Sequence, residues 1–339
     1  MIRNQWYIVL ESREVRPHKP TGVTRMGEKL VFWRDSHGEV QCMGDHCPHM
    51  NAQLHQGVVE GDCLACPFHG FTYDASGQCV YLPAFGKAAT PPKVLKAHTY
   101  PAYEHQGFIW IWWGEEPPAG LQPPPWFESI AGDFSYATVQ DPWPVHYSRS
   151  AENQLDMSHL PYVHHNTIGR GQRTIVDGPV VQVQDERIDV WVFNRKDDGT
   201  PRRDASELDI STRAHPSLQF QFPNYWHNWI GDKVRVTAAF VPVDDDHTIL
   251  YLRFYQRFLK IPLLRELVNF IGTWMSIVIA HQDRRIVSGQ APNKTAYKMG
   301  ERLRPSDAAI HAYRKERRRL KQQAGQEEED LFVREREAK

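Results

Sequence analysis

The first third of the chain alternates short apolar runs with turn-forming residues. Between residues 22 and 114, glycine, proline, aspartate and serine interrupt these runs every few positions; residues 29–33, for example, precede the turn-like residues 35–38. Short runs rich in β-branched and aromatic residues predict strands joined by tight turns. The last run, residues 108–113, lies between two glycines and predicts a buried strand. We therefore expect an all-β N-terminal domain over residues 1–115.

A proline-rich segment separates this domain from the rest of the chain. Residues 115–125 contain five prolines, which disfavour both a helix and a central strand. Beyond this segment, the pattern predicts helices near residues 148–159 and 263–288. Strand-like runs are found at 180–183, 188–193, 234–241 and 248–254. We expect an α+β domain over residues 126–339, with an antiparallel sheet flanked by helices. The density of charged residues at its end, about 306–339, predicts a solvated helix that frays into disorder.

Composition and charge narrow the class of protein. The 339 residues include 40 Lys and Arg against 41 Asp and Glu, a balance that argues against a nucleic-acid binder with a basic surface. The longest nearly apolar stretch, residues 270–280, is about half of the roughly 20 residues that span a bilayer. The N-terminus lacks the features of a signal peptide. We expect a cytoplasmic protein without a nucleic-acid or membrane partner.

Two short segments that combine cysteine and histidine form the first candidate metal site. They read Cys47-Pro48-His49 and Cys66-Pro67-Phe68-His69. Two thiolates and two imidazoles can hold tetrahedral zinc, or a [2Fe–2S] cluster with cysteines on one iron and histidines on the other. The one-residue spacer in the first segment, the proline after each cysteine and the nearby glycines favour the cluster. Spacing alone does not exclude Cys63 as a ligand.

A second candidate site combines two histidines with an aspartate. Asp156 and His159 are three residues apart, so both would lie on one face of the predicted helix. His164 follows five residues after His159, about 140° around an ideal helix. Both imidazoles can bind one metal only if the helix bends or ends between them, and Pro161 gives a reason for this. Spacing does not exclude His165 in place of His164.

The carboxylate that would complete this site is Asp283. It lies in the predicted helix 263–288 on an apolar face, where an unpaired carboxylate is costly. Two imidazoles and one carboxylate form the facial triad of non-haem Fe(II) oxygenases. The alternative is an ion pair between Asp283 and a cation such as Arg284 or Arg285.

These motifs resemble those of the Rieske non-haem iron oxygenases. The segment 47–70 resembles the Rieske iron–sulfur family, and the match covers the first domain. The second half resembles the catalytic domain of the oxygenases, in which the pattern N-x2-D-x2-H-x4-H recurs. The residues that match this pattern are Asn153, Asp156, His159 and His164.

The resemblance implies a role for each of these residues. It implies that Cys47, His49, Cys66 and His69 hold one [2Fe–2S] cluster, and that His159, His164 and Asp283 hold one mononuclear Fe(II). Asp156 would link the cluster of one subunit to the iron of the next, and we include Asn153 of the same motif as a catalytic candidate. Gln282 departs from the Glu-Asp pair that is common in relatives.

The resemblance also narrows the type of Rieske protein. Rieske proteins of respiratory and photosynthetic chains carry an extra cysteine in each cluster loop, joined as a disulfide. Here Ala52 and Phe68 occupy those positions. This departure favours the oxygenase type of cluster.

The function implied is that of an oxygenase component. It would use O₂ to hydroxylate or oxidatively demethylate a small aromatic or cyclic substrate, as in the monooxygenase and demethylase branch. The chain has no GxGxxG motif, so electrons would come from a separate NAD(P)H-dependent reductase, directly or through a ferredoxin. The resemblance also implies a head-to-tail ring of subunits, which in such families is usually a homotrimer.

Several alternatives stay open from the sequence. One is a ring cis-dihydroxylating dioxygenase, and another is a Rieske electron-transfer protein whose second domain is not catalytic. The aromatic and amide-rich segment 217–229 is consistent with either a pocket wall or a core strand.

Overall fold

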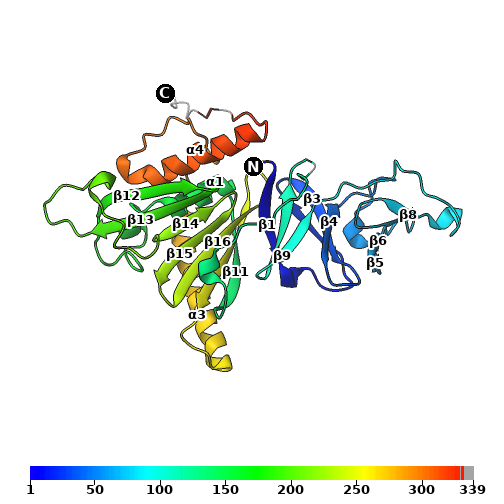
Figure 1. Ribbon diagram of the computed structural model, residues 1–339, viewed down its shortest axis with the longest axis horizontal. Helices are drawn as coiled ribbons and strands as arrows, with labels where there is room; N and C mark the ends of the chain where they lie inside the picture. Colours follow the sequence, from blue (N-terminus) through cyan, green and yellow to red (C-terminus); the bar gives the residue numbers. More distant parts are fainter. Residues whose placement is uncertain (116, 329, 332–339) are drawn as a thin grey trace. The chain divides into compact units, whose positions relative to one another are not determined.

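The computed structural model describes residues 1–115, 117–328, 330 and 331, and it divides the chain into two compact units. The first comprises Arg3–Pro124 together with Pro242–Asp244. The second comprises most of the chain from Pro125 onward. Figure 1 shows the first unit in blue to cyan and the second in green to red.

The first unit is built from short strands, as the turn-rich sequence predicts. Its sheets have the orders β1-β10-β9, β2-β3-β4 and β5-β6-β7-β8. The strands are β1 (Gln5–Glu11), β2 (Thr21–Arg25), β3 (Glu28–Arg34), β4 (Val40–Gly44), β5 (Val58–Glu60), β6 (Cys63–Ala65), β7 (Thr72–Tyr73), β8 (Cys79–Tyr81), β9 (Ala102–His105) and β10 (Phe108–Trp113). The prediction of an all-β N-terminal domain is confirmed.

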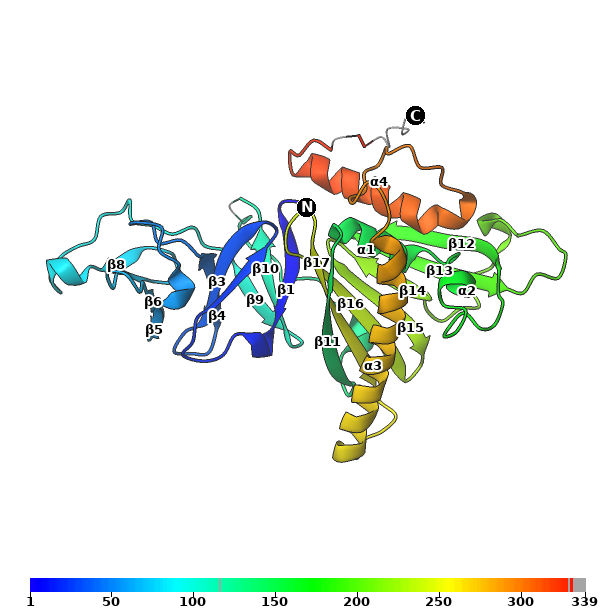
Figure 2. The ribbon, with the colours of Figure 1, turned by 180° about the vertical axis from the view of Figure 1, so that it is seen from behind.

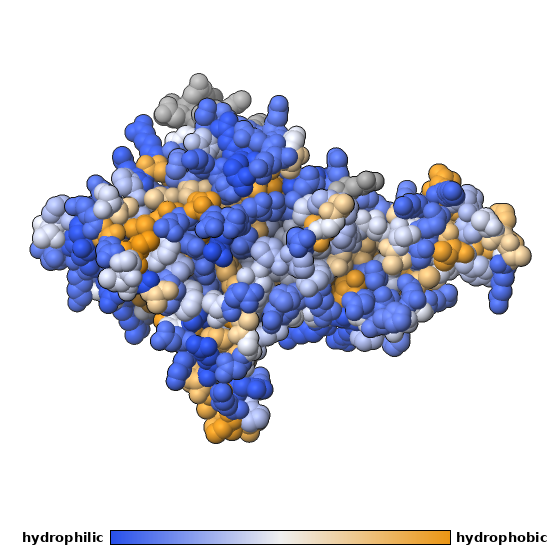
Figure 3. All heavy atoms as spheres, in the orientation of Figure 1, coloured by the Kyte–Doolittle hydropathy of each residue, from blue (hydrophilic) through white to orange (hydrophobic). Residues whose placement is uncertain are grey.

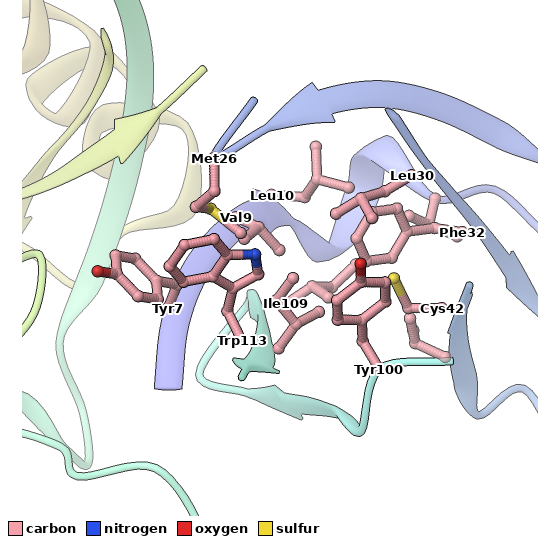
Figure 4. Close-up of a cluster of buried hydrophobic side chains, with 13 residues drawn as sticks. Tyr7, Val9, Leu10, Met26, Leu30, Phe32, Cys42, Tyr100, Ile109 and Trp113 are labelled. Atoms are coloured by element: carbon pink, nitrogen blue, oxygen red, sulfur yellow. The ribbon is translucent and has the colours of Figure 1, made fainter. Parts of the chain in front are cut away.

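The apolar run that predicts a buried strand lies in the middle of its sheet. Strand β10 pairs with β1 on one side and β9 on the other. Ile109, Ile111 and Trp113 of this strand join a buried cluster with Tyr7 and Phe32, and Figure 4 shows most of its side chains in contact. Alternate residues of β10 point into this cluster because successive side chains of a strand face opposite sides.

The second unit is a seven-stranded antiparallel sheet with helices packed against it, so the α+β prediction is confirmed. The strand order is β11-β17-β16-β15-β14-β13-β12. Its strands are β11 (Ser135–Trp143), β12 (Ile175–Gln184), β13 (Arg187–Arg195), β14 (Leu218–Gln221), β15 (Tyr225–Gly231), β16 (Val234–Pro242) and β17 (Thr248–Gln256). Its helices are α1 (Tyr147–Leu155), α2 (Leu160–Val163), α3 (Pro262–Val287) and α4 (Ala308–Gln323).

Helix α3 lies across β11 and β17, and Figure 2 shows it running along the sheet. It packs with small or polar residues, because Asn269, Gly272 and Thr273 are buried. Leu263 and Phe270 are 83% and 66% exposed, and Figure 3 shows hydrophobic surface at the end of α3 that extends beyond the sheet. By length and composition alone, this helix is apolar enough to cross a membrane, and 22% of its most apolar window is buried. The short uninterrupted run 270–280 therefore understated how apolar the helix is.

The charged end of the chain forms the predicted helix, α4, but the prediction that this helix is solvated and frays is wrong. Helix α4 packs on β12 and β13. Arg314 and Arg317 are buried, and Arg314 forms a two-pronged ion pair with Glu152 at 2.9 and 2.6 Å. Arg317 Nη1 donates to Glu328 Oε1 at 2.8 Å. Charged residues are buried here because they pair with each other, which a count of charges does not reveal. The predicted tail beyond residue 331 lies outside the described residues.

Candidate metal centres

The two predicted cluster segments form loops of the same design. One follows β4, and the other joins β6 to β7. In each loop the cysteine carbonyl accepts a hydrogen bond from the amide four residues later, Asn51 N at 2.8 Å and Gly70 N at 3.0 Å. Both of these later residues have positive φ, 56° and 71°, as such tight turns require.

This arrangement fits a [2Fe–2S] cluster. The thiols of Cys47 and Cys66 are buried, whereas His49 and His69 are exposed and their rings lie 4.8 Å apart. The paired loops therefore present sulfur on the inner side and nitrogen on the outer side. Sulfur for one iron and imidazole for the other is the ligand set of a Rieske cluster.

The loops also supply hydrogen bonds to sulfur. Tyr73 Oη lies 3.1 Å from Cys47 Sγ. Burial, together with the nearby Cys47, raises the pKa of Tyr73, so its hydroxyl keeps its proton and can donate. Burial raises the pKa of the Cys66 thiol, while backbone amides of Phe68 and His69 donate toward its sulfur and oppose that rise. Such donors tune the reduction potential of a bound cluster. Cys63, the rival ligand, lies in strand β6 and not in a loop.

The second site is organised by one short turn of helix. His159 immediately precedes α2 and His164 immediately follows it, and their rings lie 5.1 Å apart. The single helix predicted over 148–159 is wrong at its end, because α1 stops at Leu155 and Asp156 has an extended backbone with ψ of 125°. The chain therefore breaks before Asp156. Pro161 lies in the first turn of α2, where proline is tolerated because its missing N–H has no partner there.

Three ligand atoms meet at this site. His159 Nε2, His164 Nε2 and Asp283 Oδ1 are separated by 3.0, 3.2 and 3.4 Å. His164 and Asp283 are buried, and Asp283 Oδ1 accepts no hydrogen bond within the part of the chain that the structure describes. Imidazole, imidazole and carboxylate match the facial triad that binds Fe(II).

Neighbouring side chains hold the three ligands through their far atoms. His164 Nδ1 donates to Gln282 Oε1 at 2.8 Å, which leaves Nε2 of a neutral imidazole as an acceptor. Gln154 Nε2 donates to Asp283 Oδ2 at 3.1 Å. These two contacts leave His164 Nε2 and Asp283 Oδ1 each with a lone pair directed at the other ligand atoms. Acceptors this close repel each other unless a proton or a cation lies between them, so the residues present fit a metal ion.

Asp156 has the same relation to His159. Its Oδ2 lies 3.3 Å from His159 Nδ1, and its Oδ1 accepts a hydrogen bond from Ser158 N at 2.7 Å. The backbone amide of Ser158 thus orients the carboxylate toward the imidazole. Asn153 lies one helical turn earlier, at the end of α1, and its Nδ2 is buried without a hydrogen-bond partner in the described chain.

The charges at the site shift two pKa values. Burial alone would lower the pKa of His159, but the adjacent carboxylates of Asp156 and Asp283 favour the charged imidazolium, outweigh burial and raise the pKa to about 9. Burial would raise the pKa of Asp283, but the two histidines lower it to about 2. Asp283 therefore stays ionised at neutral pH, as a metal ligand must.

The alternatives to these ligands lie elsewhere. His165 is exposed, and its Nδ1 lies 2.9 Å from Tyr162 O. Arg284 Nη1 pairs with Asp141 Oδ1 at 2.6 Å instead of Asp283, so an Arg284–Asp283 ion pair is wrong. The sequence reasoning did not find the contact with Gln282. The only sign of this contact in the sequence was that Gln282 replaces the glutamate of the common Glu-Asp pair.

Comparison with known proteins decides the family. The Rieske [2Fe–2S] domain matches residues 5–99, and the vanillate O-demethylase oxygenase C-terminal domain matches residues 143–323, more than half of the chain. The chain belongs to the Rieske non-haem iron oxygenases. Family membership brings one Rieske [2Fe–2S] cluster and a candidate mononuclear iron site made of two histidines and one aspartate.

Similar curated proteins share about a quarter to a third of their residues with this chain over the parts that align. The protein TIC 55, chloroplastic, of Arabidopsis thaliana is 26% identical over 92% of this chain and 58% of its own length. The toluene-4-sulfonate monooxygenase system iron-sulfur subunit TsaM1 of Comamonas testosteroni is 34% identical over 50% of this chain and 48% of its own length. The chain spans about half the length of these curated relatives.

A solved structure supports the fold over nearly the whole chain. NdmA of Pseudomonas putida CBB5 superposes with a TM-score of 0.75 at 21% identity, covering 94% of this chain and 91% of that protein. At this level of identity the likeness concerns the fold.

Proposed function

We propose that this chain is the oxygenase component of a Rieske non-haem iron system that hydroxylates or oxidatively demethylates a small cyclic substrate. The observation that carries the proposal is the buried meeting of His159 Nε2, His164 Nε2 and Asp283 Oδ1. A non-catalytic domain has no reason to bring three metal-ligating atoms together beside a cavity. The match to an O-demethylase oxygenase domain supports the same branch.

The proposal assigns two groups of ligands. Cys47, His49, Cys66 and His69 would hold the cluster, and His159, His164 and Asp283 would hold Fe(II). The iron, when bound, supplies the site at which O₂ is activated. Hydroxylation places one atom of O₂ in a substrate C–H bond and reduces the other to water, and it consumes two electrons and two protons. The electrons come from a separate NAD(P)H-dependent reductase, directly or through a ferredoxin.

The chain's own side chains orient the site. Gln282 fixes the tautomer and ring direction of His164, and Gln154 holds Asp283. Apolar residues around the ligands exclude water, which strengthens the electrostatic interactions inside the site. These contacts set the ligands in place before substrate arrives.

Asp156 is assigned the link between the two kinds of metal site. It is partly exposed, with 27% of its side chain accessible, and it lies next to His159. We propose a homotrimer in which Asp156 of one subunit faces the exposed cluster histidines of a neighbouring copy. We also propose a cytoplasmic location, although relatives include proteins described as chloroplastic.

The test is the content of iron and acid-labile sulfide per chain in anaerobically purified protein. We expect about three irons and two sulfides, with one iron lost in His159→Ala. His165→Ala is the matched control, because this neighbouring histidine is exposed and points to Tyr162 O; it should retain all three. Two irons in the wild type, unchanged in His159→Ala, would mean that the protein is an electron carrier and not an oxygenase.

A further inference from the structure

A cavity of about 270 Å³ lies beside the three ligand atoms. It is open to solvent on one side and is lined by one face of the sheet, by α3 and by the segment that contains His159 and His164. Strand β15 supplies Trp226, Asn228 and Ile230, every second residue, while His227 and Trp229 between them face the other side. The aromatic and amide-rich segment 217–229 therefore contributes side chains both to the pocket wall and to the core. The volume is suited to a compact ring compound.

The wall of this cavity is mainly apolar. On the sheet, the wall is formed by Leu218, Trp226, Ile230, Val236, Leu250 and Leu252. Helix α3 adds Ile279 and Ala280 next to Asp283. A ligand bound here exchanges water for hydrocarbon contacts over most of its surface, which favours an apolar molecule.

The charged groups of the wall are limited to the metal site. Its titratable residues are Asp156, His159, His164 and Asp283, and no Lys or Arg of the described chain lines the cavity. Apart from a bound metal ion, no cation of the described chain would compensate for the hydration that a carboxylate or sulfonate loses here, and the anion would lie near the Asp156 carboxylate. Burial of an unpaired charge is strongly unfavourable.

Two side-chain amides in the wall are available to a ligand: Asn153 at the end of α1, whose Nδ2 has no hydrogen-bond partner in the described chain, and Asn228 on the sheet. The side-chain amide of Asn228 has no hydrogen-bond partner among the residues that the structure describes, and the residue is partly exposed. The two serine hydroxyls of the wall already form hydrogen bonds within the protein. Ser276 Oγ donates to Gly272 O, and Ser217 Oγ accepts from Val192 N. Asn228 can donate or accept, so it suits an amide, carbonyl, ether or hydroxyl group.

A neighbouring cavity of about 570 Å³ does contain cationic side chains, Arg173 and Arg213. Leu160, Ile168 and Val192 line both cavities and form the wall between them. Neither of these guanidinium groups lines the cavity beside the ligand atoms.

We propose that the substrate is a neutral, mainly apolar ring compound whose single polar group hydrogen-bonds to Asn228, and that compact anions are rejected. The inference rests on the function proposed for the site. It separates this chain from its relative whose name specifies toluene-4-sulfonate, an anion.

The test compares two probes of nearly equal shape, para-methoxybenzamide and para-methoxybenzoate. Their binding to the metal-loaded protein is measured by calorimetry at neutral pH, without reductase. We expect the neutral amide to bind at least about thirtyfold more tightly than the anion. Asn228→Leu should weaken binding of the amide about tenfold and leave binding of methoxybenzene unchanged.

A variant that introduces a positive charge into the cavity wall gives a second test of the preference for neutral ligands. Ile230 lines the cavity yet is 59% exposed, so Ile230→Arg should fold, and it should shift the preference toward the benzoate. Benzoate binding equal to or tighter than amide binding in the wild type would overturn the inference, as would the absence of binding by both neutral probes. If the protein contains three irons but binds the benzoate more tightly than the amide, only this inference fails. If the third iron is absent but the neutral preference holds, only the oxygenase proposal fails.

Discussion

At the scale of single residues, the candidate iron site depends on partners that the ligand spacing does not reveal. His159, His164 and Asp283 were all candidates from the sequence, because imidazole pairs and a carboxylate on an apolar face are unusual enough to notice. Gln282 was not, because its contact with His164 joins residues that are 118 positions apart. Chain spacing predicts neighbours on one element but not contacts between elements.

Gln282 gives a direct prediction. Gln282→Leu removes the acceptor of the His164 Nδ1 proton, so the imidazole loses its fixed tautomer and orientation. Loss of such a partner typically weakens metal binding about 10- to 100-fold. Competition with an Fe(II) chelator measures the change. Gln290→Leu is the control, because this exposed glutamine follows α3; equal iron retention by the two variants would show that Gln282 does not position His164.

At the scale of elements, the sequence predicted the existence and type of the long segments better than their ends. The helix expected at 263–288 is α3, Pro262–Val287, and the runs at 234–241 and 248–254 lie in β16 and β17. Strand β11 was not predicted, whereas β14 and most of β15 lie in the aromatic and amide-rich segment 217–229, for which a strand was one of the two interpretations. Strand β11 contains Pro142 and polar residues, which are acceptable because it forms an edge of the sheet.

Close packing of α3 on the sheet depends on one glycine. A Cβ at Gly272 would lie 2.5 Å from the ring of Phe254, so Gly272→Ala must displace the ring or the helix that carries Asp283. Forcing extra volume into a packed interface costs about 1 to 3 kcal/mol. The free energy of unfolding in urea measures this. Gly231→Ala, where a Cβ would meet nothing within 4 Å, should change it by less than about 1 kcal/mol; equal losses would argue against the tight contact.

At the scale of the whole molecule, stability should depend on pH through a buried histidine outside the metal site. His227 is fully buried, and its Nδ1 donates to Gln219 Oε1 at 3.0 Å. Burial, reinforced by the charges of Arg235 and His215, lowers its pKa to about 3. Unfolding restores an ordinary pKa of about 6.5, so the unfolded chain takes up a proton below that pH. The folded state therefore loses stability as pH falls from about 6.5 toward 3.

The corresponding experiment compares urea unfolding of the wild type and His227→Gln. Between about pH 7 and pH 5.5, the wild type should lose about 1 kcal/mol more than the variant, because glutamine does not titrate. Other titrating groups are common to both proteins and cancel in the comparison. The same pH dependence in both proteins would contradict a buried, neutral His227.

The central claim concerns two metal sites with different ligands in one chain. Anomalous difference maps from crystals of anaerobically purified protein, recorded on both sides of the iron absorption edge, test it most directly. We expect one iron peak among Cys47, His49, Cys66 and His69, and a second within bonding distance of His159 Nε2, His164 Nε2 and Asp283 Oδ1. Iron at the first site, with no iron peak or a zinc signal at the second, would contradict it.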